Sequence, residues 1–432
     1  MTSLVSPQQR TVSRHAYWDP EIFRREQELV FKKSWLFVAH ESEIAHNGDY
    51  LTRRMGADPV IVSRDEHGRL RVFLNTCPHR GTALCRTDMG NSSHFRCSYH
   101  GWTFTNSGDL RGVPEMREVY PSSFDKSAIR LFEAPHVDVH AGLVFACWDP
   151  EAPTLQTFLG DFAWYLHALF GKTDFEVVGA PMRGIVRTNW KIGAENYMGD
   201  GYHLTTTHKS AIDMGVFEPG RKMPQLGTYI ERKHPSYCVD AGNGHGIRIQ
   251  RMPLEFETPT FLGYPEQMWS AFADALDPGQ IEMQQALAVA HGNAFPNCSI
   301  LEAFAPHVGA DTSPSMYLHI RQWHPLAADS TELWMWCLVP RAASEEWKLG
   351  SQRAFTRHLG FGGVFETDDF QNWTSMATNN QTPTAWQHSF NYEGRPVSPA
   401  ADVDWPGDVY PVDHAEVNQQ AMYRRWQELM AQ

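Results

Sequence analysis

The sequence predicts an α+β protein with a small all-β domain and a larger domain in which helices pack against an antiparallel sheet. The chain has 432 residues, which is too long for one ordinary hydrophobic core and indicates two domains. Residues 35–150 consist of short apolar-alternating runs separated by turn residues, which is typical of an all-β domain. After Pro153 the helical and strand patterns are mixed.

The first expected element is a helix after Asp19 and Pro20, because Asp19 is suited to cap a helix and Pro20 to occupy its first position. Its apolar residues would share one face; they are Ile22, Phe23, Leu29 and Val30. Residues 60–75 alternate between apolar and polar on both sides of a turn at 66–68, which predicts a hairpin. Residues 140–150 predict another strand that is closed by a turn.

In the larger domain, residues 161–171 predict a helix that ends at a glycine. Residues 297–305 and 315–340 predict strands. A second helix is expected from Ser344 to Leu359, and a last helical segment is expected after the glycine pair at 362–363.

The composition excludes several classes of protein. With 37 Lys and Arg against 50 Asp and Glu, the net charge is −13, which argues against nucleic acid or an anionic membrane as a partner. No apolar run approaches the roughly 18 residues that a membrane span needs, and residues 1–18 have no apolar signal core, so we expect a cytoplasmic protein. Seven cysteines, most of them scattered, argue against a disulfide framework and favour metal chemistry for paired Cys and His.

The stretch CPHRGTALCRTDMGNSSHFRCSYHGW contains two such pairs, Cys77 with His79 and Cys97 with His100. Two Cys and two His suit a tetrahedral zinc, or a Rieske [2Fe–2S] cluster in which two Cys hold one iron and two His hold the other. Each arm supplies one residue of each kind, which favours a cluster whose two loops both reach both irons.

C-P-H-R-G and C-S-Y-H-G-W together resemble the Rieske motif of ring-hydroxylating oxygenases. The resemblance implies that Cys77, His79, Cys97 and His100 hold a [2Fe–2S] cluster, and zinc is the alternative. Cys85 lies between the arms and is not a ligand in this pattern, so we expect it to pack as a small buried hydrophobe. The other cysteines stand in apolar, strand-like surroundings and are interpreted as core; they are Cys147, Cys238, Cys298 and Cys337.

A second group lies in NWKIGAENYMGDGYHLTTTHKS, residues 189–210. Asn196, Asp200 and His203 are four and three residues apart and would share a helix face. His203 and His208 are five apart, about 140° on an ideal helix, so they meet one metal only where the helix is distorted or ends. The glycines on both sides of Asp200 and the three threonines at 205–207 predict such a distortion. Taken alone, this motif favours the interpretation that both histidines are ordinary surface residues.

The order Asn-x3-Asp-x2-His-x4-His also resembles the catalytic domain of Rieske oxygenases. This resemblance implies that His203 and His208 bind a mononuclear Fe(II), as in two-histidine, one-carboxylate centres. Asp200, with Asn196 in the catalytic group, would be the carboxylate that links His203 to His100 of the partner subunit.

The carboxylate ligand is expected in GFGGVFETDDFQNW, residues 360–373. By resemblance to the family's E-x-D-D pattern the ligand is Asp369, with Asp368 as the alternative. Glu366 and Asp368 are interpreted as the solvated start of a helix, where acids are favoured by the helix dipole.

HGNAFPNCSIL, residues 291–301, is similar to a segment that forms a pocket wall in the family, with Phe295 beneath it. The implied substrate-binding residues, for which simple core packing is the alternative, are Tyr197, Leu204, His291, Asn293, Leu359 and Phe365. This lining is mostly apolar and has no aligned Arg or Lys, which favours a neutral or polycyclic aromatic hydrocarbon. An aromatic acid stays open because three cations lie in regions that could reach the pocket: Lys209, Arg248 and Arg251.

The resemblance covers nearly the whole chain and implies the large (α) subunit of a Rieske non-haem iron aromatic-ring-hydroxylating dioxygenase. The implied parts are an N-terminal helix packed on the catalytic domain (1–35), the Rieske domain (36–155) and the catalytic domain (156–432). Electrons would come from a ferredoxin, an NAD(P)H-dependent reductase or both, and O₂ would add to an aromatic ring as a cis-dihydrodiol. A small β subunit in an α₃β₃ assembly is expected, with α₃ as the alternative.

Two other classes of function remain at this stage. One is a Rieske monooxygenase or demethylase that acts on an aromatic acid with the same metals. The other is a non-enzymatic redox carrier or a zinc-stabilised binding protein. Metal content separates them, because the oxygenase should hold about three irons per chain, a carrier two and a zinc module none.

Overall fold

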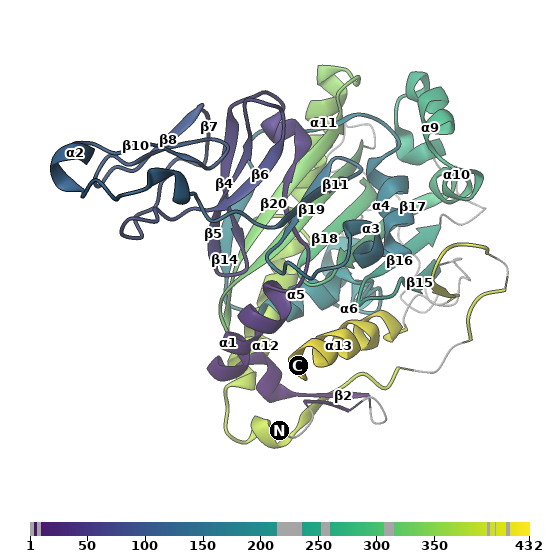
Figure 1. The fold of residues 1–432 in the computed structure, drawn as a ribbon. Coiled ribbons are helices and arrows are strands. Elements are labelled where there is room, and N and C mark those ends of the chain that lie inside the picture. The colour runs from purple at the N-terminus through teal and green to yellow at the C-terminus, as the bar shows by residue number, and fades with distance from the viewer. Residues whose placement is uncertain are drawn as a thin grey trace. The chain divides into compact units, whose positions relative to one another are not determined.

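The computed structural model describes residues 4–6, 10–213, 236–251, 260–305, 315–394, 398–401, 403–411 and 415–432. The chain forms two compact units (Figure 1). Phe31–Leu155 make the small unit, and Met1–Val30 together with Gln156–Gln432 make the large unit. None of the helices in the described part of the chain combines the length and apolarity that a membrane crossing requires.

The small unit is almost entirely β, as predicted. Its three antiparallel sheets have the strand orders β11-β12-β3, β6-β5-β4-β7 and β10-β9-β8. The strands are β3 (Leu36–His40), β4 (Asp49–Met55), β5 (Asp58–Arg64), β6 (Leu70–Leu74), β7 (Met89–Asn91), β8 (His94–Arg96), β9 (Thr103–Thr105), β10 (Leu110–Gly112), β11 (His136–His140) and β12 (Leu143–Cys147), with one short helix, α2 (Met116–Val119).

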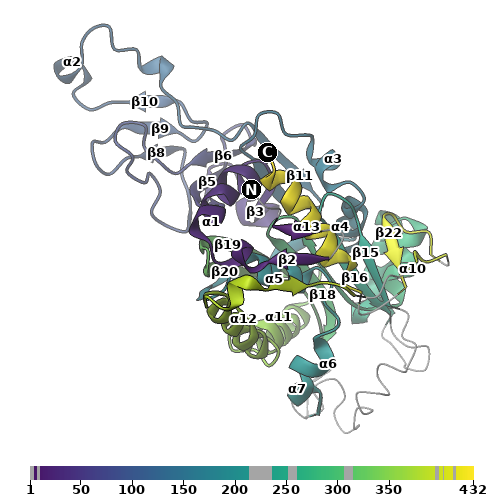
Figure 2. The same cartoon turned by 90° about the horizontal axis from the view of Figure 1, so that it is seen from below.

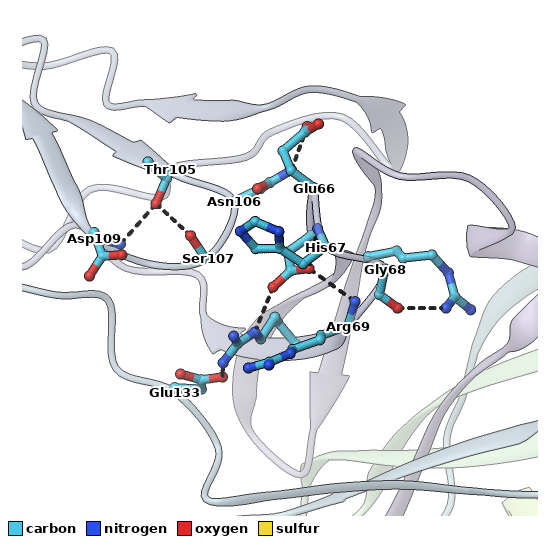
Figure 3. Close-up of polar contacts among 12 residues, drawn as sticks. Glu66, His67, Gly68, Arg69, Thr105, Asn106, Ser107, Asp109 and Glu133 are labelled. Carbon is cyan, nitrogen blue, oxygen red and sulfur yellow. Dashed lines mark hydrogen bonds and ion pairs between the residues drawn. The ribbon is translucent and has the colours of Figure 1, made fainter.

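The predicted hairpin is formed by β5 and β6, and a buried carboxylate holds its turn. Asp65 accepts hydrogen bonds from the backbone N–H groups of His67 (2.8 Å) and Arg69 (2.9 Å), and from Nε of Arg71 (3.0 Å). Arg71 also donates to Glu133 (2.7 Å), which ties the hairpin to the segment before β11 (Figure 3). These contacts hold the turn of the hairpin, and its second strand, β6, leads into the first Cys/His loop.

The large unit is built on one nine-stranded antiparallel sheet with the order β13-β20-β19-β18-β17-β16-β15-β22, and β14 also pairs with β20. Its strands are β13 (Phe175–Val177), β14 (Met182–Val186), β15 (Ser236–Asp240), β16 (Gly246–Arg251), β17 (Leu287–Ala294), β18 (Cys298–Ala305), β19 (Ser315–Ala327), β20 (Ser330–Pro340) and β22 (Asp408–Tyr410). A separate small sheet joins β1 (Val5–Ser6), β2 (Thr11–Ser13) and β21 (Ser389–Asn391).

Helices pack on both faces of the large sheet. The principal helices are α1 (Pro20–Glu26), α4 (Phe162–Phe170), α5 (Trp190–Tyr197), α6 (Leu204–Thr207), α7 (Lys209–Asp213), α9 (Trp269–Ala275), α10 (Pro278–Gln285), α11 (Glu345–Leu359), α12 (Glu366–Asn380) and α13 (Val417–Met430). Glu302 of β18 accepts from Gln284 of α10 (3.1 Å) on one face. On the other face, α5 lies so close to Trp323 of β19 that a side chain at Gly193 would collide with the indole.

Helix α13, drawn in yellow in Figures 1 and 2, packs against α5, β15 and β16. This helix was not predicted, since the segment after the glycine pair at 362–363 is the last helix expected from the sequence. That segment is α12, and α13 follows it with no side chain capping its N-terminus, so the usual start signal is absent.

Helix α1 begins as predicted, with Asp19 accepting from the backbone N–H of Glu21 (2.8 Å). The chain then continues as a π-helix, Gln27–Phe31. Its buried face includes Ile22 and Val30, but also Glu26, which is fully buried. The Glu26 carboxylate meets three donors of the large unit: Trp190, Lys191 and Trp426.

Candidate metal centres

The first centre is formed by two loops of the small unit, between β6 and β7 and between β8 and β9. Cys77 and Cys97 are buried, at 1% and 3% exposure; burial raises the pKa of the Cys77 thiol, and the neighbouring Cys97 thiol adds to that rise. The rings of His79 and His100 lie side by side with centroids 4.6 Å apart, and both are more exposed than the cysteines. The four residues therefore form a buried sulfur pair and an outer imidazole pair.

This arrangement fits a two-iron cluster better than one zinc. A tetrahedral zinc, with bonds of about 2.0–2.3 Å, holds its four ligand atoms within about 4 Å of one another. Within the described residues, a single group of three or more His, Cys, Asp or Glu ligand atoms lies within 4.8 Å, and it is elsewhere in the chain. Two separate pairs are what a cluster with two Cys on one iron and two His on the other requires.

Both loops turn in the same way. The N–H of Gly81 (φ 76°) donates to the carbonyl of Cys77 at 2.9 Å, and the N–H of Gly101 (φ 71°) donates to that of Cys97 at 3.0 Å. Positive φ is the conformation that favours glycine, so these glycines let each loop fold its histidine back beside its cysteine. Cys85 is buried, which raises the pKa of its thiol to about 12, and it packs as a small apolar residue as predicted.

The second centre brings together three predicted residues of the large unit. Nε2 of His203 lies 3.2 Å from Nε2 of His208. The two oxygens of Asp369 lie 3.6 Å from these two nitrogens, one from each. All three ligand atoms lie within 4.8 Å of one another.

The break in the helix makes this convergence possible. Helix α5 ends at Tyr197, and Gly199 has φ 118° in a position where a side chain would collide with Arg248. His203 and His208 then flank the short helix α6, one at each end. The predicted distortion is present, but the expected single helix face is not, since Asp200 lies beyond the end of α5.

Asp200 and Asn196 lie beside this centre. Oδ2 of Asp200 lies 3.3 Å from Nδ1 of His203. The backbone N–H of Asp200 donates to the carbonyl of Asn196 at 3.1 Å. Asp200 and Asn196 also line an open cavity of about 260 Å³ together with residues of α12, β21 and α13. Asp200 thus contacts His203 on one side and this cavity on the other.

The electrostatics of the second centre suit a cation. Burial raises the pKa of the Asp369 carboxyl to about 7, which marks a buried negative charge that a bound cation would stabilise. Burial, reinforced by the neighbouring His203, lowers the pKa of His208 to about 3. Burial also opposes a charge on His203, but its hydrogen bond and attraction to Asp200 prevail and raise its pKa. The neutral His208 is in the state that metal ligation needs, whereas His203 must give up the proton on Nε2 to bind a metal.

One expectation about this segment is wrong. Glu366 is not at the solvated start of a helix: it is fully buried and paired with Arg321 of β19. Its Oε1 accepts from Nη1 of Arg321 at 2.6 Å. Asp368 is partly exposed, and its Oδ2 lies 3.5 Å from Nδ1 of His208. Arg321 is the only Lys or Arg of β19, and that is the sequence signal that could have suggested a buried acid nearby.

The predicted pocket residues surround this centre unequally. The ring of Phe365 stands edge-on to His208 with centroids 5.1 Å apart. Tyr197 lies under the Arg321 guanidinium at 4.4 Å, and the carbonyl of Leu359 accepts from the same guanidinium at 3.0 Å. Leu204 of α6 is half-buried. Arg321 thus packs directly against two of the predicted lining residues.

His291 and Asn293 of β17 are both buried and hydrogen-bonded within the large unit. Nη1 of Arg248 lies 3.3 Å from Nε2 of His291, so the buried Arg248 belongs to this face. Asn293 donates to the carbonyl of Pro296 (3.1 Å) and accepts from Ser299 (2.8 Å), which uses both ends of its amide within the β17–β18 hairpin.

The other two cations considered for the pocket, Lys209 and Arg251, and also Phe295, differ in their surroundings. Lys209 is exposed, and Arg251 pairs with Glu282 and stacks over Trp405. Phe295 is buried in the hairpin next to Asn293.

Comparison with known proteins defines the class. Residues 34–130 match the model of the Rieske [2Fe-2S] domain, and residues 155–432 match the ring hydroxylating alpha subunit (catalytic domain). The fold and the two centres are therefore those of a Rieske-type oxygenase, which holds a [2Fe–2S] cluster and a mononuclear iron.

The chain belongs to the family of ring-hydroxylating alpha subunits, the terminal oxygenase components of aromatic-ring dioxygenases. It is 33% identical to the N,N-dimethyl phenylurea N-demethylase subunit alpha of a Sphingobium species, over 95% of this chain and 90% of that protein. It is 32% identical to the large oxygenase component of the naphthalene 1,2-dioxygenase system of Pseudomonas aeruginosa, over 94% of this chain and 86% of that protein. The solved naphthalene 1,2-dioxygenase from Rhodococcus sp. bound to indole superimposes with a TM-score of 0.91 and 37% identity, covering 97% of this chain and 94% of that one.

Proposed function

We propose that this chain uses O₂ and electrons from a ferredoxin, an NAD(P)H-dependent reductase or both to cis-dihydroxylate a neutral aromatic compound. The observation that carries the proposal is the meeting of His203, His208 and Asp369 in a chain that also has the paired Cys/His loops of a Rieske domain. Fused aromatic hydrocarbons are the first substrates to test, because two of the named relatives are naphthalene dioxygenases.

The proposed ligands of the mononuclear iron are His203, His208 and Asp369, and those of the cluster are Cys77, His79, Cys97 and His100. Such a cluster would supply electrons, and the mononuclear iron would supply redox chemistry with O₂. Oδ2 of Asp200 lies 3.3 Å from Nδ1 of His203, an ion-pair distance that would favour a proton on Nδ1 and leave Nε2 free for the metal. Phe365 packs edge-on against His208, which is 3% exposed, and helps to keep water from it.

The assembly is also part of the proposal. Asp200 would link His203 to His100 of the partner subunit, which requires a ring of α subunits. A trimer with a small β subunit, α₃β₃, is proposed, with α₃ alone as the alternative; the names of two relatives, subunit alpha and large oxygenase component, are consistent with a multi-subunit enzyme. We place the protein in the cytoplasm, where its seven free cysteines stay reduced. The domains are taken to be 1–35 with 156–432, and 36–155.

A second function is favoured by one observation. The relative that is 33% identical over 95% of the chain is named an N-demethylase, so the same metals could here remove an N-alkyl group instead of forming a diol. The two functions differ in product: one gives a cis-dihydrodiol that carries both atoms of ¹⁸O₂, and the other gives a dealkylated amine.

Metal analysis of a matched pair of variants tests the site. His203→Ala should lower the iron content from about three to about two per chain, keep the visible spectrum of the cluster, and abolish turnover. His46→Ala removes a histidine whose side chain is 85% exposed and should change neither iron nor turnover. A His203→Ala protein that still holds three irons, or that still oxidises naphthalene, would show that the catalytic iron is bound elsewhere.

A further inference from the structure

Two buried histidines near the second centre have ring nitrogens without partners. His319 lies on β19 and His358 on α11, and they are 0% and 1% exposed. Within the described residues, neither Nδ1 nor Nε2 of either ring has a hydrogen-bond partner. Buried polar groups in folded proteins are nearly always paired, so four unpaired nitrogens in one region need an explanation.

Each histidine lies one aromatic ring away from the predicted site. The His358 ring is 5.6 Å from Phe365, and Phe365 is 5.1 Å from the proposed iron ligand His208. The His319 ring is 6.0 Å from Tyr197, another predicted lining residue. The unpaired nitrogens thus belong to the shell that surrounds the proposed substrate site.

A third ring joins the two histidines. The Tyr317 ring lies 5.7 Å from His358 and 6.1 Å from His319. Tyr317 and His319 are two residues apart on β19, so their side chains point to the same face of the sheet. The two imidazoles are therefore neighbours on either side of one tyrosine.

The surroundings keep both imidazoles neutral. Burial lowers the pKa of His358 to about 4, and it lowers that of His319 well below the usual range, with the nearby Arg321 adding to the effect. A neutral imidazole offers one N–H donor and one nitrogen acceptor. The two neutral imidazoles together can pair with a carbonyl, a hydroxyl or an amide. A carboxylate would need a positive charge, which neutral imidazoles do not supply.

We propose that His319 and His358 form a polar subsite that binds a neutral hydrogen-bonding group of the aromatic substrate. The proposal rests on the proposed function and narrows its substrate class: the preferred substrate is an aromatic ring system that bears a carbonyl, hydroxyl or amide group. A plain hydrocarbon of the same shape binds more weakly, because it leaves the four nitrogens buried and unpaired.

Equilibrium binding to the iron-loaded protein, without O₂ or reductant, tests the subsite. The two ligands are naphthalene and 2-quinolinone, which share a fused bicyclic shape but differ in a carbonyl and an N–H. The wild type should bind 2-quinolinone at least about tenfold more tightly than naphthalene. His319→Phe and His358→Phe should each remove most of that preference, while the Kd for naphthalene stays within about twofold.

Two further variants keep the test decisive. His324→Phe removes another buried histidine of β19, five residues away and on the opposite face, and should leave the preference unchanged. His319→Gln keeps a donor and an acceptor and should restore part of the preference. The Tm of His319→Phe and of His358→Phe should be no lower than that of the wild type, because each substitution removes buried polar groups that have no partner.

Several results would overturn the proposal: equal loss of affinity for both ligands, a preference that survives in both Phe variants, or a wild type without preference. Because binding is measured without turnover, none of these results depends on which reaction the enzyme catalyses. Conversely, a demethylated product would correct the proposed reaction and leave the subsite untouched.

Discussion

Replacing Glu366 by alanine should destabilise the large unit, because it leaves the Arg321 guanidinium buried without its carboxylate. Both side chains are 0% exposed, and the two groups make close contacts of 2.6 Å at both oxygens. Removing one member of a buried ion pair costs about 3–5 kcal/mol. For a unit of about 300 residues, the unfolding entropy is about 0.6 kcal/mol/K, so Tm should fall by about 5–8 °C.

The same change should release the proposed catalytic iron. Glu366 begins α12 three residues before Asp369, and Arg321 also donates to the carbonyl of Leu359 at the end of α11. The ion pair therefore determines where the proposed carboxylate ligand lies. Calorimetry should show the fall in Tm, and metal analysis should show about two irons per chain with the visible spectrum of the cluster intact.

Two controls make the reasoning refutable. Glu345→Ala removes a carboxylate of α11 that is 89% exposed and should shift Tm by less than about 1 °C. The double variant Arg321→Met with Glu366→Met should recover much of the stability, because two apolar side chains replace a matched pair of charges. If the Glu366→Ala variant has the same Tm as the wild type and keeps three irons, the ion pair does not hold the start of α12 in place.

Three other changes should have distinct results. Cys85→Ala should leave iron and sulfide content unchanged and cost about 1 kcal/mol as a small cavity, whereas Cys77→Ala should lose the cluster; metal analysis and denaturant unfolding separate the two. Asp65→Asn should lower the unfolding free energy by about 1–3 kcal/mol at pH 7. Burial alone would raise the pKa of Asp65, but its hydrogen bonds hold that pKa below the usual range, so this stabilisation is present above about pH 4 and is lost as pH falls further. Glu195→Gln should match the wild type in Tm near pH 4.5 and exceed it by a few degrees at pH 8, because burial raises the pKa of Glu195 to about 8 and the wild type loses stability as pH rises between these values.

The sequence predicted what depends on near neighbours in the chain. The cap at Asp19, the hairpin turn after Arg64 and the cap at Ser344 are all made by side chains within four residues of the backbone they hold. The Cys/His loops and the helix break before His203 belong to the same kind, since spacing and glycines determine them locally. The fold class and most of the proposed metal ligands could be predicted from these local features.

What the sequence did not reveal depends on distant partners. Glu366 has the local signature of an exposed helix start, and only Arg321, 45 residues earlier, makes it a buried residue. Arg248 reaches His291 across two paired strands, which no periodicity predicts. His319 has unpaired nitrogens only because its surroundings are apolar and aromatic, and that too is a property of the packed structure.

The Glu26 carboxylate has a consequence for how the chain folds as it is synthesised. It accepts a hydrogen bond from Trp426 at 2.8 Å across a separation of 400 residues. During synthesis, the first helix therefore carries an acid on its apolar face that lacks this partner until the last helix has left the ribosome. The small unit lies between the two helices in the sequence and can form its own sheets in the meantime. Contacts between residues so far apart in the sequence slow folding and prolong the exposure of apolar surface that can aggregate. Deleting the final helix should take the Trp426 donor away from Glu26 and uncover the faces of α5, β15 and β16 that α13 covers, and the product should aggregate while its iron–sulfur loops still form.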